Sequence, residues 1–489
     1  MDNEATKNRN TQSGNPFELS HDQMRQYGYR IVDMIIAHFE TVGDKRPVTK
    51  ATREQMDWLL QEPIPENATP VMDVLDHVES NIFANSAHLD HPKFYSFVPS
   101  PNNIVSTFAD ALATGFNLFS GAWVSSPGAA ELEMLTTNWL LRLYGFPVVE
   151  GGGLFVSGGS MANLTAMVTA RQNILGDDFS KGVVYWSDQT HSSVERAARV
   201  IGLRKDQIRI IPTDSNFCLD FDSLRDAVEN DVSAGNQPFL IVANGGTTNT
   251  AAVDPLFPIN TLCRHHNIWM HVDAAYGGAA ILCSSGKAAL AGIELADSVT
   301  IDPHKWFHQP YEIGCLLVRD NQRLAGTFRT QPVYLRDLVG AAEEVNFYDQ
   351  GIQLTRRFRA LKFYMSMKTY GLGAFRESVK GAIELTEQLE SNLQQAPDWE
   401  VITGASLAVI TFRFNPANEK LSEDEIDRIN QHISDQIIAD GKAMLATTIV
   451  NNRTVLRMCL INPRTTMVDL QSTIDSLEQY AEQFLYEPR

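Results

Sequence analysis

The sequence has no apolar stretch long enough to cross a membrane, and its beginning carries no secretion signal. Its first residues, "MDNEATKNRNTQSGNP", are polar and lack the apolar centre of a signal peptide. A membrane-spanning helix needs about 20 consecutive apolar residues. We therefore expect a soluble, cytoplasmic protein that does not act at a membrane.

Cysteine is also scarce. The chain has five, Cys218, Cys263, Cys283, Cys315 and Cys459, an odd number without Cys-x-x-Cys spacing. This pattern argues against a disulfide framework and against a zinc site. We expect packed, reduced thiols and no metal.

Basic residues are outnumbered, since 40 Lys and Arg face 59 Asp and Glu and the net charge is −19. Such a charge disfavours a broad surface for nucleic acid, so any phosphate must be bound locally. The 489 residues, of which 44% are hydrophobic, suffice for two or three domains.

The first part, residues 1–103, is expected to be mainly helical. "QMRQYGYRIVDMIIAHFE" has apolar side chains at helical spacing, and "VMDVLDHVESNIF" repeats the pattern after the Pro-rich "EPIPENATP". Because this segment has little core of its own, we expect it to pack on a second subunit.

Residues 104–370 alternate short apolar strands, such as "GGLFVS", "GVVYWS" and "FLIVANGG", with amphipathic helices. This alternation predicts an α/β domain with a mostly parallel sheet and a ligand beyond the carboxyl ends of its strands. In residues 371–489, "LAVITFRF" and "TVLRMCLI" predict strands with one covered face. A final helix starts at the capping-box pair Thr466 and Asp469, which completes a small α+β domain.

Two strand ends carry residues suited to chemistry. In "SVTIDPHKWF", Lys305 follows a strand, although a lysine considered alone is most simply a solvated turn residue. In "HVDAAYGG", Asp273 ends another strand, and the alternative is a carboxylate that caps a turn. A buried carboxylate needs a partner, and the small residues after it leave room for a flat ligand.

A third motif, "VSGGSMANL", places Gly158 and Gly159 between a strand and a helix. Glycines and free amides at a helix start can bind a phosphate, although a tight turn capped by Ser160 is the alternative. The spacing matches neither a Walker loop nor a dinucleotide fingerprint. With Lys305 and Asp273, this turn fits pyridoxal 5'-phosphate, which needs an amine for its aldehyde, an acid for its ring nitrogen and amides for its phosphate.

Two more residues are weaker candidates when they are considered alone. His191, in "SDQTHSSVERA", could stack on the ring or be a solvated loop histidine. Thr248, in "NGGTTNTAAVDP", could touch the ring or belong to a polar turn.

Together, "SPGAAELEM", "SGGSMAN", "HSSVERA", "TTNTAAVDP", "HVDAAYGG", "ADSVTIDPHKW" and "RRFRALKFYMSMKTYG" resemble the group II pyridoxal phosphate-dependent amino acid decarboxylases, above all those for aromatic amino acids. The motifs span about residues 90–375. The resemblance implies an aspartate aminotransferase-like, fold type I homodimer in which both subunits build each active site.

By motif position, the resemblance implies that Lys305 carries the cofactor, Asp273 pairs with its ring nitrogen and His191 stacks on the ring. Tyr334, in "QPVYLRDL", matches the tyrosine of a mobile catalytic loop. The remaining implied cofactor contacts are Gly158, Gly159, Thr248, Ala275, Ser298 and His304.

The sequence departs from the family pattern in two places. Asp302 stands where many relatives have asparagine near the phosphate, and we expect it to turn away or to bond to a backbone amide. "FVPS" matches the family's substrate wall only loosely. We expect Phe97, Val98 and Ser100 to contact the substrate side chain, and the lack of an obvious cation there favours an aromatic one.

The predicted reaction is loss of carbon dioxide from an L-amino acid, followed by protonation of Cα to give an amine. The alternatives are a decarboxylase for an acidic or small amino acid and an oxidative aldehyde synthase, against which Tyr334 speaks. A silent cofactor-binding homologue that acts as an interaction protein is the non-enzymatic alternative.

Overall fold

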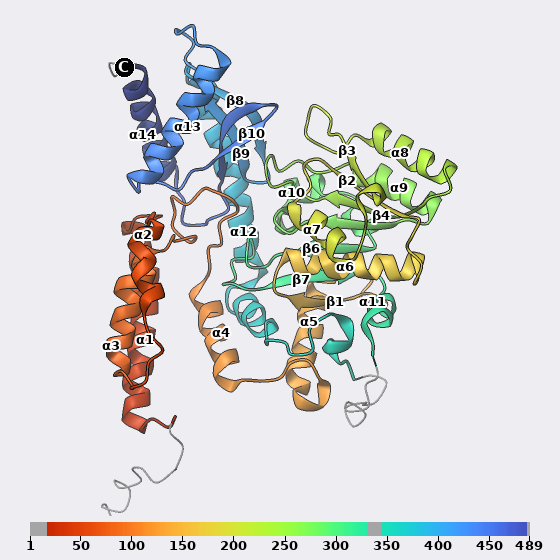
Figure 1. Cartoon of the computed structure of the whole chain (residues 1–489), viewed down its shortest axis with the longest axis horizontal. Helices are drawn as coiled ribbons and strands as arrows, with labels where there is room; N and C mark the ends of the chain where they lie inside the picture. The colour runs from red at the N-terminus through yellow and green to blue at the C-terminus, as the bar shows by residue number, and fades with distance from the viewer. Residues whose placement is uncertain (1–16, 331–343, 487–489) are drawn as a thin grey trace, which may run out of the picture.

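The computed structural model describes residues 17–330 and 344–486. Figure 1 shows the N-terminal helices standing beside a large α/β part, with a smaller α+β part at the C-terminal end. The long helix α12 runs between the last two parts.

The large part is built on a seven-stranded sheet in the order β1-β7-β6-β5-β4-β2-β3. β2 to β6 pair in parallel, whereas β7 is antiparallel to both β1 and β6. The mostly parallel sheet expected from the sequence is therefore confirmed. The strands are β1 (Gly152–Val156), β2 (Gly182–Ser187), β3 (Ile208–Ile211), β4 (Gln237–Asn244), β5 (Trp269–Asp273), β6 (Ser298–Ile301) and β7 (Gly314–Val318).

Helices cover both faces of this sheet, and the alternation of side chains along β2 shows it. Val183 and Tyr185 enter the core formed with α5, α8 and α9, whereas Val184 and Trp186 enter the core formed with α6 and α7. The continuous apolar runs of the strands follow from this double burial. The helices of this part are α4 (Ile104–Phe116), α5 (Pro127–Leu143), α6 (Gly159–Leu175), α7 (Ser192–Val200), α8 (Phe221–Ser233), α9 (Leu256–His266), α10 (Ser284–Ala289) and α11 (Asn321–Phe328).

A buried ion pair ties this part together. Arg356 donates to both carboxylate oxygens of Glu133 on α5 and to the backbone oxygen of Phe155 in β1. The Glu133 carboxylate also accepts the Phe155 amide at 2.8 Å. The segment that leads into α12 is thereby fixed to the sheet.

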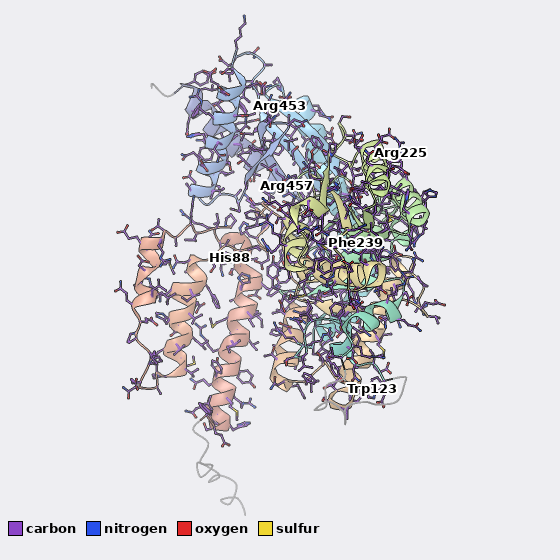
Figure 2. The ribbon with its side chains drawn as sticks, turned by 45° about the vertical axis from the view of Figure 1, so that its right-hand side comes forward. His88, Trp123, Arg225, Phe239, Arg453 and Arg457 are labelled. Carbon is purple, nitrogen blue, oxygen red and sulfur yellow. The ribbon has the colours of Figure 1, made fainter. Side chains whose placement is uncertain are left out.

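The N-terminal segment contains α1 (His21–Thr41), α2 (Arg53–Met56) and α3 (Val71–His77). A capping box at Ser20 and Gln23 starts α1. No residue of α1 is buried, and apolar side chains such as Met24, Tyr29 and Ile36 are exposed. Figures 1 and 2 both show these helices extending away from the rest of the chain.

The C-terminal part has a four-stranded antiparallel sheet in the order β10-β11-β9-β8. Its elements are α12 (Ala360–Gln395), β8 (Trp399–Ser406), β9 (Val409–Phe414), α13 (Glu423–Ala439), β10 (Thr447–Val450), β11 (Arg453–Cys459) and α14 (Met467–Tyr486). Gly371, with φ 73°, interrupts α12.

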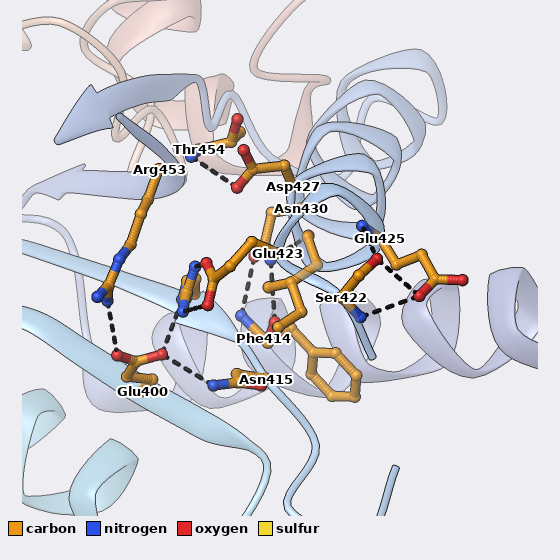
Figure 3. Close-up of polar contacts among 12 residues, drawn as sticks. Glu400, Phe414, Asn415, Ser422, Glu423, Glu425, Asp427, Asn430, Arg453 and Thr454 are labelled. Atoms are coloured by element: carbon orange, nitrogen blue, oxygen red, sulfur yellow. Dashed lines mark hydrogen bonds and ion pairs between the residues drawn. The ribbon is translucent and has the colours of Figure 1, made fainter. Parts of the chain in front are cut away.

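Polar contacts brace this small sheet (Figure 3). The Asn430 side chain accepts the amide of Phe414 and donates to its carbonyl, which joins α13 to β9. Glu400 accepts hydrogen bonds from Asn415 and Arg453. Among the helices that the structure describes, none has the length and apolarity needed to cross a membrane.

Candidate active site

The candidate site lies beyond the carboxyl ends of the parallel strands, where such sheets bind ligands. Asn244 ends β4, Asp273 ends β5, and Lys305 follows β6. Together with the start of α6, these ends surround a cavity of about 310 Å³. Eight of the expected cofactor contacts line it: Gly158, Gly159, His191, Thr248, Asp273, Ala275, His304 and Lys305.

Of the described residues that line this cavity, Lys305 alone is a lysine, and its amine is paired. Lys305 Nζ lies 3.0 Å from Asp302 Oδ2. Burial disfavours the charged amine, but the carboxylates of Asp302 and Asp273 outweigh burial and raise the pKa of Lys305. In the absence of a ligand, Lys305 is therefore an ammonium.

The expectation that Asp302 turns away or bonds to a backbone amide is wrong. Its side chain is 3% exposed and lines the cavity. Oδ2 pairs with Lys305 and lies 3.6 Å from His304 Nε2, while Oδ1 has no hydrogen-bond partner. Attraction to Lys305 keeps the carboxylate inside.

Asp273 is held by two donors. Asn163 Nδ2 donates to Oδ2 at 2.8 Å, and the Ala275 amide donates to Oδ1 at 3.1 Å. These bonds fix a buried carboxylate at the floor of the cavity. Asn163, on α6, was missed from the sequence because an asparagine inside a helical pattern carries no signal of its own.

A second layer of side chains orients Asn163. Its Oδ1 lies 3.0 Å from His271 Nε2 and accepts from Thr300 at 2.8 Å. Complete burial lowers the pKa of His271 to about 4. The imidazole is therefore neutral at pH 7, and its Nε2–H can donate to Asn163 while Nδ1 accepts from Ser298.

Ser298 does not line the cavity. It begins β6, at the opposite end of the strand from Lys305. Its fully buried Oγ accepts from Trp269 Nε1 and bonds to His271 Nδ1, both at 2.8 Å. The resemblance implied that Ser298 contacts the phosphate. In the structure its hydroxyl instead bonds to His271 and orients that ring.

The glycine turn leaves space where a side chain would collide. A Cβ on Gly159 would lie 2.9 Å from Asp302 Oδ2 and 3.2 Å from the Ala275 Cβ. The turn opens directly into α6, whose first amides have no partner within the helix. An anion can therefore approach the backbone closely at this point.

His191 caps the start of α7, and its Nδ1 accepts the Ser193 amide at 3.3 Å. Although solvent reaches the ring, partial burial lowers its pKa, so a neutral imidazole lines the cavity at pH 7. The expected loop histidine is thus held in one orientation.

The expected substrate wall lies outside the cavity lining. Ser100 donates to the His304 carbonyl at 2.5 Å, whereas the Phe97 side chain is 64% exposed; Val98 packs against the main core. The Phe97 carbonyl accepts from Arg457, a buried cation that the sequence analysis missed.

Arg457 lies in β11, where the C-terminal part meets the large one (Figure 2). Its Nε donates to the Asn249 carbonyl, and its Nη2 has no partner. Tyr334 lies outside the described residues.

In the described part of the chain, one group of possible metal ligands lies away from this cavity. His38, His88 and Asp90 bring their ligand atoms within 4.8 Å of one another. The Asp90 carboxylate is already 2.9 Å from His38 Nε2 and 3.8 Å from Arg464. These existing partners account for the cluster as an ion-pair network.

The residues around the cavity fit pyridoxal phosphate. A paired amine, a buried carboxylate braced by two donors and a glycine turn at a helix start surround one space. The start of α6 has no side-chain cap among the described residues, so its first amides can take a phosphate as their acceptor. The Asp302 carboxylate in this lining disfavours the phosphate.

Comparison with known proteins gives the same result. Residues 53–415 match the family described as "Pyridoxal-dependent decarboxylase conserved domain". Aromatic-L-amino-acid decarboxylase from Bacillus atrophaeus is 44% identical over 467 residues, which are 95% of this chain and 97% of that protein. Phenylacetaldehyde synthase from Arabidopsis thaliana is 32% identical over 459 residues, which are 91% of this chain and 93% of that protein.

Among solved structures, that of Oryza sativa TDC with PLP and tryptamine superposes with a TM-score of 0.91 at 29% identity. The match covers 96% of this chain and 100% of that chain. The fold type I architecture and the cofactor expected from the sequence are thereby confirmed. The chain belongs to the pyridoxal-dependent decarboxylase family, and it is a pyridoxal phosphate-dependent decarboxylase.

Proposed function

We propose that this decarboxylase acts on aromatic L-amino acids and releases the corresponding amine and carbon dioxide. The observation that carries the proposal is that Lys305, Asp273 and the glycine turn line one cavity. The aromatic preference is supported by the Bacillus relative, whose name states it and which spans nearly the same length.

When bound, the cofactor supplies an electron sink for the pair left behind as carbon dioxide departs. Lys305 would hold the cofactor through its aldehyde, and its amine would be the group that the substrate amine replaces. Asp273, fixed by Asn163 and the Ala275 amide, holds a proton at the ring nitrogen. His191, neutral at pH 7, would stack on the ring.

Gly158 and Gly159, with the first amides of α6, would hold the phosphate, and Thr248, Ala275 and His304 would contact the rest of the cofactor. Tyr334 delivers the proton to Cα. Contact of Phe97, Val98 and Ser100 with the substrate side chain stays a prediction from the sequence, because these residues lie outside the cavity lining. The buried Arg457, which donates to the Phe97 carbonyl, is a cation that the sequence analysis did not expect there, so the aromatic preference rests on the Bacillus relative.

We further propose a homodimer with shared active sites. The exposed apolar side chains of α1 and the absence of buried residues on that helix support it. In this arrangement residues 1–103 pack on the partner, residues 104–370 bind the cofactor, and residues 371–489 form the small domain. A cytoplasmic location stays a prediction from the sequence.

The first test is Lys305→Ala. The wild-type protein should be yellow, and the variant should lose both this absorbance and turnover, because the described lining of the cavity contains no second lysine. Borohydride reduction followed by peptide mapping identifies the attached lysine. An adduct on a different lysine would contradict the assignment.

The second test separates amine formation from aldehyde formation, since one relative is a phenylacetaldehyde synthase. Carbon dioxide, amine, aldehyde and hydrogen peroxide are measured across a panel of aromatic, acidic and small amino acids. Tyr334→Phe should still release carbon dioxide but divert product from amine to aldehyde. An unchanged amine yield per carbon dioxide would remove Tyr334 from the role of proton donor, and no release from any amino acid would favour a silent homologue.

A further inference from the structure

Asp302 places a third charged group at a site where Lys305 and Asp273 account for the proposed chemistry. Its carboxylate is nearly inaccessible, at 3% exposure, and pairs with Lys305 at 3.0 Å. Its other oxygen is buried without a hydrogen-bond partner. A buried carboxylate with one free oxygen is costly unless its charge is compensated, and Lys305 is the compensating charge here.

Two glycine backbones lie close to this carboxylate. A Cβ on Gly159 would lie 2.9 Å from Oδ2, and a Cβ on Gly314 would lie 2.8 Å from Oδ1. The carboxylate therefore lies between the turn at the start of α6 and the first residue of β7. That turn is also the place where an anion would bind.

Other charged and titratable groups face Lys305 from several elements. Asp273 raises its pKa from the end of β5, as does Tyr311 in the loop before β7. The remaining neighbours are His191 before α7, His304 beside Lys305, Glu312 before β7 and Cys459 in β11. Asp302 makes the largest favourable contribution to the charged amine.

We propose that Asp302 restrains loading of the cofactor by keeping Lys305 protonated in the cofactor-free protein. The inference rests on the proposed role of Lys305 as the attachment residue. An ammonium has no electron pair with which to attack an aldehyde, so the Lys305 proton must first pass to solvent. The neutral amine then adds to the aldehyde carbon, a carbon–nitrogen double bond forms, and the carbonyl oxygen leaves as water.

The same carboxylate also opposes the phosphate. Asp302 Oδ2 lies next to the glycine turn, so a phosphate dianion held there would share its surroundings with a negative charge. Pyridoxal lacks the phosphate and therefore reports on the amine alone, whereas pyridoxal 5'-phosphate reports on both effects.

The experiment measures loading rates on cofactor-free protein. Wild type and Asp302→Asn are mixed with pyridoxal or pyridoxal 5'-phosphate from about pH 6 to about pH 9, and the absorbance of the newly formed imine is followed. Asparagine keeps the shape and removes the charge. Glu312→Gln is the matched control, because Glu312 lines the cavity but pairs with Arg359 at 2.6 Å.

If removal of Asp302 lowers the Lys305 pKa by one unit, Asp302→Asn should load pyridoxal about tenfold faster near neutral pH. The midpoint of the pH–rate curve should move down with it, and the gain should be larger for pyridoxal 5'-phosphate. The Glu312→Gln curve should keep the wild-type midpoint. Asp302→Ser, a smaller neutral residue, should reproduce the result if the asparagine variant folds poorly.

Equal or slower loading of both aldehydes by folded Asp302 variants would overturn the proposal. A gain confined to pyridoxal 5'-phosphate would also overturn it, because that gain would come from the phosphate and not from the Lys305 proton. Mapping the borohydride-reduced adduct separates these outcomes from failure of the proposed function: an adduct on another lysine would show that Lys305 is not the attachment residue.

Discussion

The N-terminal helices and the large sheet contain apolar residues in similar patterns but use them in opposite ways. Helix α1 has 21 residues and buries none of them, whereas β4 buries seven of its eight. The sheet finds its apolar partners within its own chain, on both faces. The N-terminal helices do not find such partners within the chain. Exposed apolar side chains of this kind are typical of a segment that packs against another protein surface.

The two regions also differ in their cavities. A groove of about 630 Å³ beside α1 is lined in part by Met34, Ile35, Phe39 and Phe83. The cavity at the sheet edge is half that size, about 310 Å³, and is lined by charged and polar groups. The groove beside α1 therefore suits apolar side chains, whereas the smaller cavity suits a charged ligand and its chemistry.

The largest expected effect comes from the helices. Ile36 and Val32 are 39% and 36% exposed on α1, and changing both to Asp should prevent a partner from covering them. We expect a folded monomer that has lost nearly all activity, since each proposed site needs both subunits. Light scattering with chromatography gives the mass, and Glu40→Gln, an exposed change on the same helix, should stay dimeric. An active, dimeric double variant would remove α1 from the interface.

The second effect belongs to the sheet edge. Asp273→Asn should lower turnover about 100-fold, because a neutral amide does not hold the ring nitrogen protonated. Unlike the α1 variant, it should remain dimeric and keep its thermal unfolding temperature. Turnover within a few-fold of wild type would make Asp273 a turn residue.

A smaller effect is expected one layer further from the cavity. Asn163→Ala removes the 2.8 Å bond to Asp273 Oδ2, and turnover should fall about 10-fold, as for other residues that orient a site group. The absorbance of the bound cofactor should shift with pH in this variant, because Asp273 is less constrained. Asn173→Ala, on the same helix but bonded to Arg323 and Thr327, is the control and should leave both readouts unchanged.

The last prediction concerns stability and not turnover. Burial lowers the pKa of both His271 and His308 to about 4. The unfolded chain takes up these protons near pH 6.5, so the free energy of unfolding should fall as the pH drops from about 6.5 to about 4. Each histidine contributes at most about 1.4 kcal/mol per pH unit.

His271→Gln tests this assignment. Chemical denaturation at several pH values should give a shallower decline for the variant, with the part due to His308 remaining. An unchanged slope would show that His271 takes up its proton equally in the folded and unfolded states.

The sequence was most informative where local pattern and tertiary structure coincide. Strand ends at Asp273 and Lys305 were recognisable because apolar runs stop there, and the parallel sheet then brings them to one edge. Ser298 shows the limit: its place in a motif says nothing about which face of β6 it occupies or that Trp269 lies within reach. The role of Asn163 depends on Asp273, which lies more than 100 residues away in the sequence. The position of the Asp302 side chain depends on its attraction to Lys305, which residue spacing does not reveal.

The antiparallel pairing of β6 and β7 limits how the length of the loop between them can vary among related chains. β6 ends at Ile301, and β7 begins at Gly314. Because Ile301 pairs with Cys315, the loop between these strands leaves and re-enters the sheet at the same end of the strands. Both anchors are fixed by strand register, so an inserted or deleted residue there would displace Lys305. Homologous chains should therefore keep this loop at constant length, while the connections at the opposite edge of the sheet are free to grow and shrink.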